Sequence, residues 1–178
     1  MSTEILKKLE GGDPRAMGQV YLVAEEFEAN PALLDEIFKG AASPNPLVKM
    51  RSAQVINRVA AQRPDYLEPY NHRLIEVLSK GRERQYRRNL IMLLPRLKLT
   101  EPEKVKVSEI LGGFLSDKNV TVVISAMEAL VELAGDDPEK QVKLLPVVDE
   151  LARTGSPAIR VRARRAQEKL FQSLTAEE

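Results

Sequence analysis

The amino-acid sequence predicts an all-α protein in which antiparallel helix pairs stack side by side into a right-handed α-solenoid. Three observations predict this class: polar capping residues recur directly before proline, apolar residues follow helical spacing, and the pattern repeats about every 37 residues. Composition agrees, because aromatic residues make up only 4% of the 178 residues and Trp is absent, so Leu, Val, Ile and Ala must form the core.

A polar residue directly before proline marks the expected start of five helices. The polar side chain can accept a hydrogen bond from an unpaired N–H of the first turn, and proline loses nothing at a position whose N–H has no helical partner. These pairs are Asp13-Pro14, Asn30-Pro31, Asn45-Pro46, Asp137-Pro138 and Ser156-Pro157.

Glycines mark the expected helix ends, where a residue with positive φ is wanted. They are Gly40, Gly81, Gly135 and Gly155. Between these signals the sequence predicts helices at 3–10, 14–29, 31–40, 46–62, 65–80, 82–98, 101–116, 119–134, 138–154 and 157–173. The connections are short, as expected between antiparallel neighbours, and no segment alternates like a strand.

The repeat becomes visible when alternate helices are aligned on one small or apolar residue. That residue recurs at intervals of 38, 36 and 37, at Ser52, Leu90, Ala126 and Ala163. Residues four before, three after and seven after it are apolar or aromatic, which defines one helical face. The helices in between repeat as well, through Leu74, Leu111 and Val148. A single pair cannot bury its apolar face, so neighbouring pairs must stack.

The aligned helices carry an apolar, a basic and a small residue in order, as in Val48-Lys49-Met50-Arg51-Ser52 and Ile159-Arg160-Val161-Arg162-Ala163. In these features the chain resembles the HEAT-repeat family over about residues 44–172, with 14–41 as a degenerate first unit. The resemblance implies about four to five repeats in one domain, 1–178. Within it we expect a capping unit at 1–43, three helix-pair repeats at 44–155 and a terminal capping helix at 156–173. Such scaffolds serve many unrelated proteins, so the resemblance predicts fold rather than partner.

Residues that carry chemistry do not converge in the sequence, so we expect a non-enzymatic protein without cofactor or metal. His72 is the single histidine, and Ser79 lies seven residues further along the same predicted helix, about 10.5 Å away. There is no Cys. Neither Gly11-Gly12 nor Gly112-Gly113 has the spacing of a phosphate-binding loop. The first pair is expected to end a helix, and the second to let another helix approach closely.

Charge is balanced in total but not in distribution. The net charge is +1, yet residues 80–98 and 156–172 are strongly basic. In the aligned helices basic residues recur three positions before the small residue and directly before it. Because these helices stack side by side, such residues form ladders that run from one helix to the next. The candidate partner-binding residues are Lys49, Arg51, Arg84, Arg87, Arg88, Arg160, Arg162 and Arg164. We expect this protein-interaction scaffold to present them to an acidic protein partner.

Two alternatives remain open for these basic residues. They can form a merely solvated or intramolecularly paired face, or they can bind nucleic acid through phosphates. HEAT-like folds include glycosylases that excise alkylated bases, but those sites rely on tryptophan, which this sequence lacks. The longest apolar run, Leu90 to Leu94, is too short to cross a bilayer, and no signal-peptide pattern opens the chain. A cytoplasmic location without a membrane partner is therefore expected.

Overall fold

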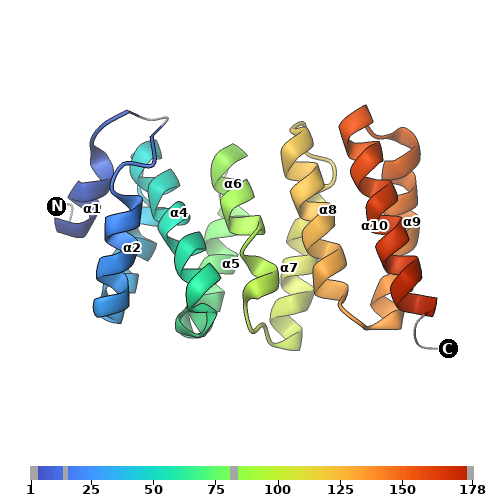
Figure 1. The fold of residues 1–178 in the computed structure, drawn as a ribbon, viewed down its shortest axis with the longest axis horizontal. Helices are drawn as coiled ribbons and strands as arrows, with labels where there is room; N and C mark the ends of the chain where they lie inside the picture. The colour runs from blue at the N-terminus through green and yellow to red at the C-terminus, as the bar shows by residue number, and fades with distance from the viewer. Residues whose placement is uncertain (1–3, 14–15, 81–83, 176–178) are drawn as a thin grey trace. The chain divides into compact units, whose positions relative to one another are not determined.

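The computed structural model describes residues 4–13, 16–80 and 84–175, apart from the side chains at 28, 29, 31 and 84–86. Over these residues the chain consists of helices and turns and contains no strand (Figure 1). The predicted all-α class is confirmed. The contacts divide the chain into two compact units, Met1–Thr100 and Glu101–Glu178, which we describe in turn. The expected single domain with its capping units stays a prediction.

The first unit is built around α4 (Pro46–Gln62), which packs against α1, α2, α3 and α6. The residues predicted for its inner face, Val48, Ser52, Val55 and Val59, are all buried. The other elements of this unit are α1 (Glu4–Glu10), α2 (Val20–Ala29), η1 (Pro31–Leu33), α3 (Leu34–Ala41), η2 (Pro64–Tyr70), α5 (Asn71–Lys80), α6 (Arg84–Ile91) and η3 (Leu94–Arg96).

The second unit contains α7 (Glu101–Phe114), α8 (Val120–Ala134), α9 (Pro138–Thr154) and α10 (Pro157–Thr175). The helix α8 contacts the other three, and α10 packs along both α8 and α9 (Figure 1). One apolar cluster joins α8, α9 and α10 through Met127, Val131, Val148, Ala163, Ala166 and Leu170. Because Ala126 and Ala163 are both fully buried, the predicted alignment on a small residue is confirmed in this unit.

Several predicted caps are confirmed by hydrogen bonds. Asn45 accepts from the N–H groups of Leu47 and Val48 at 3.0 and 3.4 Å, and α4 then runs over the predicted range. Asp137 accepts from Lys140 N–H at 3.1 Å at the start of α9. Gly135 ends α8 with φ +52°, a conformation that favours glycine.

Other boundary predictions are wrong. The helix expected from residue 14 begins at Val20, because Gly18 has φ +56° and turns the chain immediately before it; Asp13 is therefore not its cap, and Pro14 lies outside the described residues. Ser156 precedes α10, but its buried hydroxyl has no hydrogen-bond partner. Gly155 does end α9 where predicted, but its backbone is extended, at φ −63° and ψ 164°, rather than left-handed.

Proline shortens two further helices. Pro69 lies in a 3₁₀ segment, so the helix expected at 65–80 is regular only in α5. Pro95 lies in η3, and the helix expected at 82–98 ends at Ile91. Proline has no N–H for the helical ladder and clashes with the preceding turn. Residues 81–83, including the predicted helix stop Gly81, lie outside the described residues.

Two predictions about glycine are reversed. Gly112 and Gly113 are exposed, and a Cβ on either would meet no atom within 4 Å, so no helix approaches them. Gly40 does not end a helix but lies buried inside α3. A Cβ there would overlap Ser52 Oγ and would lie 2.6 Å from Leu6 Cδ2. The close approach therefore occurs between α1, α3 and α4.

Candidate functional site

Arg51, a candidate partner-binding residue, is completely buried. One guanidinium nitrogen, Nη1, donates to the carbonyl oxygens of Leu9, at 3.0 Å, and of Gly11. The other, Nη2, donates to those of Asp13, at 2.9 Å, and Ala16, at 3.2 Å. The planar guanidinium suits such a set of acceptors because its N–H groups diverge in a rigid fork.

The expectation that Arg51 contacts a partner is therefore wrong. Its side chain ties the segment between α1 and α2 to α4. A signal for this role was available in the sequence: Gly11, Gly12 and Gly18 interrupt helix in this segment, and its carbonyl groups then need donors from elsewhere.

The other candidates in the first unit are partly covered. Lys49 and Arg87 are half-buried, and each takes part in a further interaction within the chain. Arg88 is half-buried too. The side chain of Arg84 lies outside the described residues. The predicted ladder therefore does not continue as one uniformly exposed surface through this unit.

The exposed arginines lie together on α10. Arg160, Arg162, Arg164 and Arg165 are all exposed, and Arg162 forms an ion pair with Glu128 of α8 at 3.3 Å. Within the part of the chain that the structure describes, Arg160, Arg164 and Arg165 form no ion pair. We call these four arginines together with Lys169 the α10 basic surface; Glu168 is the single acidic residue of α10.

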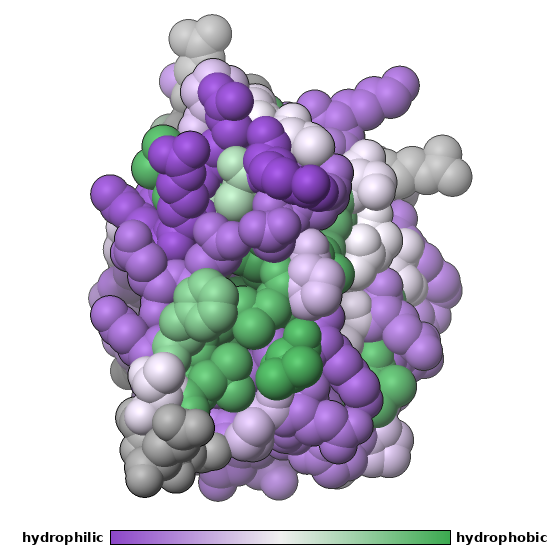
Figure 2. All heavy atoms as spheres, turned by 90° about the vertical axis from the view of Figure 1, so that its right-hand side faces the viewer, coloured by the Kyte–Doolittle hydropathy of each residue, from purple (hydrophilic) through white to green (hydrophobic). Residues whose placement is uncertain are grey.

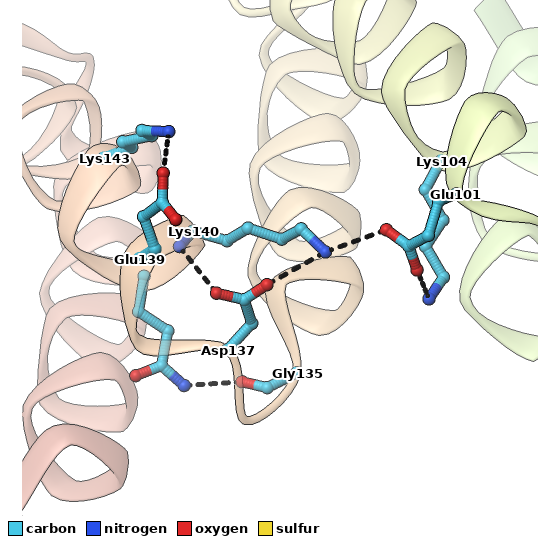
Figure 3. A network of polar contacts seen from close by, with 8 residues as sticks. Glu101, Lys104, Gly135, Asp137, Glu139, Lys140 and Lys143 are labelled. Atoms are coloured by element: carbon cyan, nitrogen blue, oxygen red, sulfur yellow. Dashed lines mark hydrogen bonds and ion pairs between the residues drawn. The ribbon is translucent and has the colours of Figure 1, made fainter.

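Some other charges of this unit are paired, as a network between α7 and α9 illustrates (Figure 3). Lys140 Nζ lies 3.0 Å from Asp137 Oδ2 and 3.2 Å from Glu101 Oε2, and Lys104 Nζ lies 2.6 Å from Glu101 Oε1. Hydrogen bonds from these lysines hold the pKa of both carboxyl groups below its ordinary value. The pKa of Lys140 is raised by hydrogen bonds to Asp137 and then Glu101. These groups are committed to joining helices.

The repeat shows why α10 differs from the helices before it. The position directly after the aligned small residue is occupied by Ala53, Ile91 and Met127, all of which are buried. On α10 the same position is Arg164, which is exposed. Three residues further on, Ile56 and Leu94 are buried, whereas α10 has the half-buried polar Gln167.

Two exposed apolar residues lie on α9 and α10, and the repeat pattern in the sequence did not single them out. Phe171 of α10 is 55% exposed and Val142 of α9 is 56% exposed. Gln141 Nε2 donates to Ser173 Oγ at 2.8 Å, so the start of α9 lies beside the end of α10. Figure 2 shows an apolar patch on this side of the molecule, surrounded by hydrophilic side chains. In the sequence, Phe171 stands where the three preceding aligned helices have Ala60, Lys98 and Ala134, so its aromatic side chain is a detectable departure.

The histidine and one described hollow lie outside the α10 basic surface. His72 is exposed on α5, and among the described residues no three His, Cys, Asp or Glu side chains group around a common point. A shallow hollow of ≈ 400 Å³ beside α9 is lined mainly by apolar residues such as Leu115, Pro146 and Val147, with Glu150 at its edge. No helix in the described ranges is both long and apolar enough to span a bilayer.

Comparisons with known proteins support the fold. No protein-family model and no curated protein matches the sequence. The chain is similar to the crystal structure of an engineered protein, with a TM-score of 0.66, 15% sequence identity, and coverage of 95% of this chain and 78% of that one. It is also similar to a HEAT-like repeats protein from the archaeon Thermococcus onnurineus NA1, with a TM-score of 0.47, 13% identity, and 98% of each chain covered. The first likeness carries the fold assignment, together with the repeated burial pattern.

Proposed function

We propose that the protein is a non-enzymatic interaction scaffold that binds an acidic protein segment through the α10 basic surface. One observation carries the proposal: Arg160, Arg164 and Arg165 are exposed on one helix and form no ion pair in the described part of the chain, and Glu168 is the single acidic residue of that helix. Exposed arginines on one helix attract carboxylates, and their planar groups can bind a carboxylate in two places at once.

A protein segment suits this surface better than nucleic acid does. Phe171 is the one aromatic residue of α10, and single-stranded nucleic acid is usually held by several aromatic side chains interleaved with basic ones. Phe171 of α10 and Val142 of α9 add exposed apolar residues to the same pair of helices, and a mixed apolar and charged surface is common where proteins bind proteins.

The test uses the full chain immobilised on a resin and incubated with cell lysate treated with nuclease. Wild-type protein is expected to retain acidic proteins that elute as salt is raised, because exposed charges are screened. A triple variant, Arg160→Glu, Arg164→Glu, Arg165→Glu, is expected to lose them while unfolding at the same temperature. Exposed substitutions of this kind usually change stability by no more than about 0.5 kcal/mol each.

Two results would contradict the proposal. The first is a triple variant that retains the same proteins in the same amounts. The second is wild-type protein that retards RNA or duplex DNA at low salt, with retardation lost in the triple variant, since that would assign the arginines to phosphate binding. A variant that melts well below wild type would show that the arginines belong to the fold's own ion pairs.

A further inference from the structure

We infer that the outward face of α10 binds a single amphipathic helix that carries carboxylates at one end and apolar residues at the other. This inference rests on the proposed function and names the partner's form. The face is a stripe of Arg160, Arg164, Gln167 and Phe171 on α10. Exposed Val142 of α9 follows Gln141, which donates to Ser173 near the end of α10. Spacings of four, three and four residues place the α10 members on one side of the helix over about 16 Å.

The helix α8 of the preceding repeat shows what packs against the equivalent face. On α8 the equivalent positions, 37 residues earlier, are Val123, Met127, Leu130 and Ala134. Val123, Met127 and Ala134 are buried, and Met127 belongs to the cluster that contains Ala163 and Leu170 of α10. Through Met127 this face of α8 packs against α10, so it serves as a docking surface for a helix. The same geometry on α10 is uncovered in the described part of the chain.

The residues in which α10 differs from α8 on this face determine which kind of helix can dock. An apolar helix would force Arg160 and Arg164 out of water without a partner, which costs free energy. A helix with two carboxylates one turn apart would pair with them. At the other end Phe171, 55% exposed, and Val142, 56% exposed, offer apolar area to aliphatic side chains.

A hydrogen bond marks the boundary between the two halves. Gln167 Nε2 donates to Asp149 Oδ1 of α9 at 3.1 Å, between Arg164 and Phe171 along the stripe. Figure 2 shows an apolar patch below a hydrophilic region on the side of the molecule where α9 and α10 lie. The partner helix therefore needs its carboxylates and its apolar side chains in a defined order, which a merely acidic segment lacks.

The probe is a synthetic helix of about 20 residues, long enough to be helical, built on alanine. It carries Glu at two positions four residues apart, and Leu seven and eleven residues after the first Glu. A matched probe has Gln in place of both Glu, and a third reverses the order of charged and apolar residues. We expect fluorescence anisotropy to show binding of the Glu probe at least about tenfold tighter than either of the others at low salt, with the gap closing as salt rises.

Two variants of equal charge change locate the site. Arg160→Glu with Arg164→Glu is expected to weaken binding of the Glu probe at least about tenfold. The control, Lys106→Glu with Lys118→Glu, changes two exposed lysines of the same unit that lie outside the α10 basic surface, and it is expected to change affinity less than about threefold. Phe171→Ala is expected to weaken the Glu and Gln probes alike and to leave the salt dependence unchanged.

Three outcomes would overturn the inference: no preference for the Glu probe, equal losses in the two charge variants, or no loss in either. Sedimentation of the chain alone can give a fourth such outcome. If the chain is a dimer and the variant Arg160→Glu with Arg164→Glu is a monomer, the face binds a second copy of this chain. The lysate experiment separates this inference from the proposed function. If the double variant retains lysate proteins as wild type does, and the triple variant that adds Arg165→Glu loses them, the proposed scaffold function is supported. The inference that the stripe binds a helix is then wrong.

Discussion

Arg51 in the first unit and Arg162 in the second stand at the same position of the repeat, directly before the aligned small residue. The side chain of Arg51 is fully buried and donates to four backbone carbonyl groups, whereas the side chain of Arg162 is 51% exposed and makes one ion pair at 3.3 Å. The neighbouring chain makes the difference. An irregular segment whose carbonyl groups accept from the guanidinium lies over Arg51, while regular α8 offers Arg162 only the carboxylate of Glu128.

The comparison teaches that a repeat position has no intrinsic role in this protein. A regular neighbouring helix satisfies its own carbonyls internally, so an arginine beside it is left for solvent or for another molecule. The same side chain beside irregular backbone becomes part of the core. The following predictions test this difference, from the largest expected effect to the smallest.

Arg51→Ala is expected to destabilise the chain by about 3–5 kcal/mol, because buried carbonyl groups lose their donors and a cavity is left. Urea unfolding monitored by circular dichroism measures the change. Arg162→Ala is the matched control and should cost less than about 0.5 kcal/mol, since exposed ion pairs contribute little. Similar losses in the two variants would contradict the contrast drawn between these positions.

Gly40→Ala is expected to destabilise the chain by about 1–3 kcal/mol, because its Cβ would overlap Ser52 Oγ and approach Leu6. The double variant Gly40→Ala with Ser52→Ala tests the cause in the same unfolding assay. Removing the hydroxyl should recover part of the loss, and a strictly additive double variant would show that the overlap is not responsible.

Gly112→Ala in the second unit is expected to act in the opposite direction and stabilise the chain by about 0.5–1 kcal/mol. The added Cβ meets no atom within 4 Å, and alanine loses less conformational entropy than glycine in a helix. Thermal unfolding measures the gain. A lower melting temperature would mean that another part of the protein approaches this face of α7 after all.

Acid should produce the smallest effect, through the network of Lys140. Hydrogen bonds with Lys104 and Lys140 lower the pKa of Glu101, and those with Lys140 lower the pKa of Asp137. Because each folded pKa lies below its unfolded value, the network's contribution is present above the ordinary carboxyl pKa and is lost as pH falls through the folded one. In Lys140→Met the urea concentration at the unfolding midpoint should decrease less steeply with falling pH below about pH 4 than in wild type. Lys118→Met, a change at an exposed lysine, serves as the control, and an equal flattening there would contradict the assignment.

The sequence by itself determined the helical class, the repeat and most of the inner faces. These follow from local rules: Asn45 and Asp137 cap helices because their side chains reach nearby N–H groups, and Val48, Ala126 and Leu170 are buried because helical spacing places them on one face. Boundaries failed where proline or a positive φ intervened, as at Pro95 and Gly18. The capping motif alone did not reveal those interruptions.

Which basic residues are available to a partner was decided only by the tertiary structure. Lys49, Arg51, Arg160 and Arg162 satisfy the same sequence pattern, yet the structure leaves the pair on α10 exposed and buries Arg51. Exposure depends on what the neighbouring segment covers and on whether its backbone groups already have partners. That information lies about 35 to 42 residues away along the chain, beyond the reach of any local helical pattern.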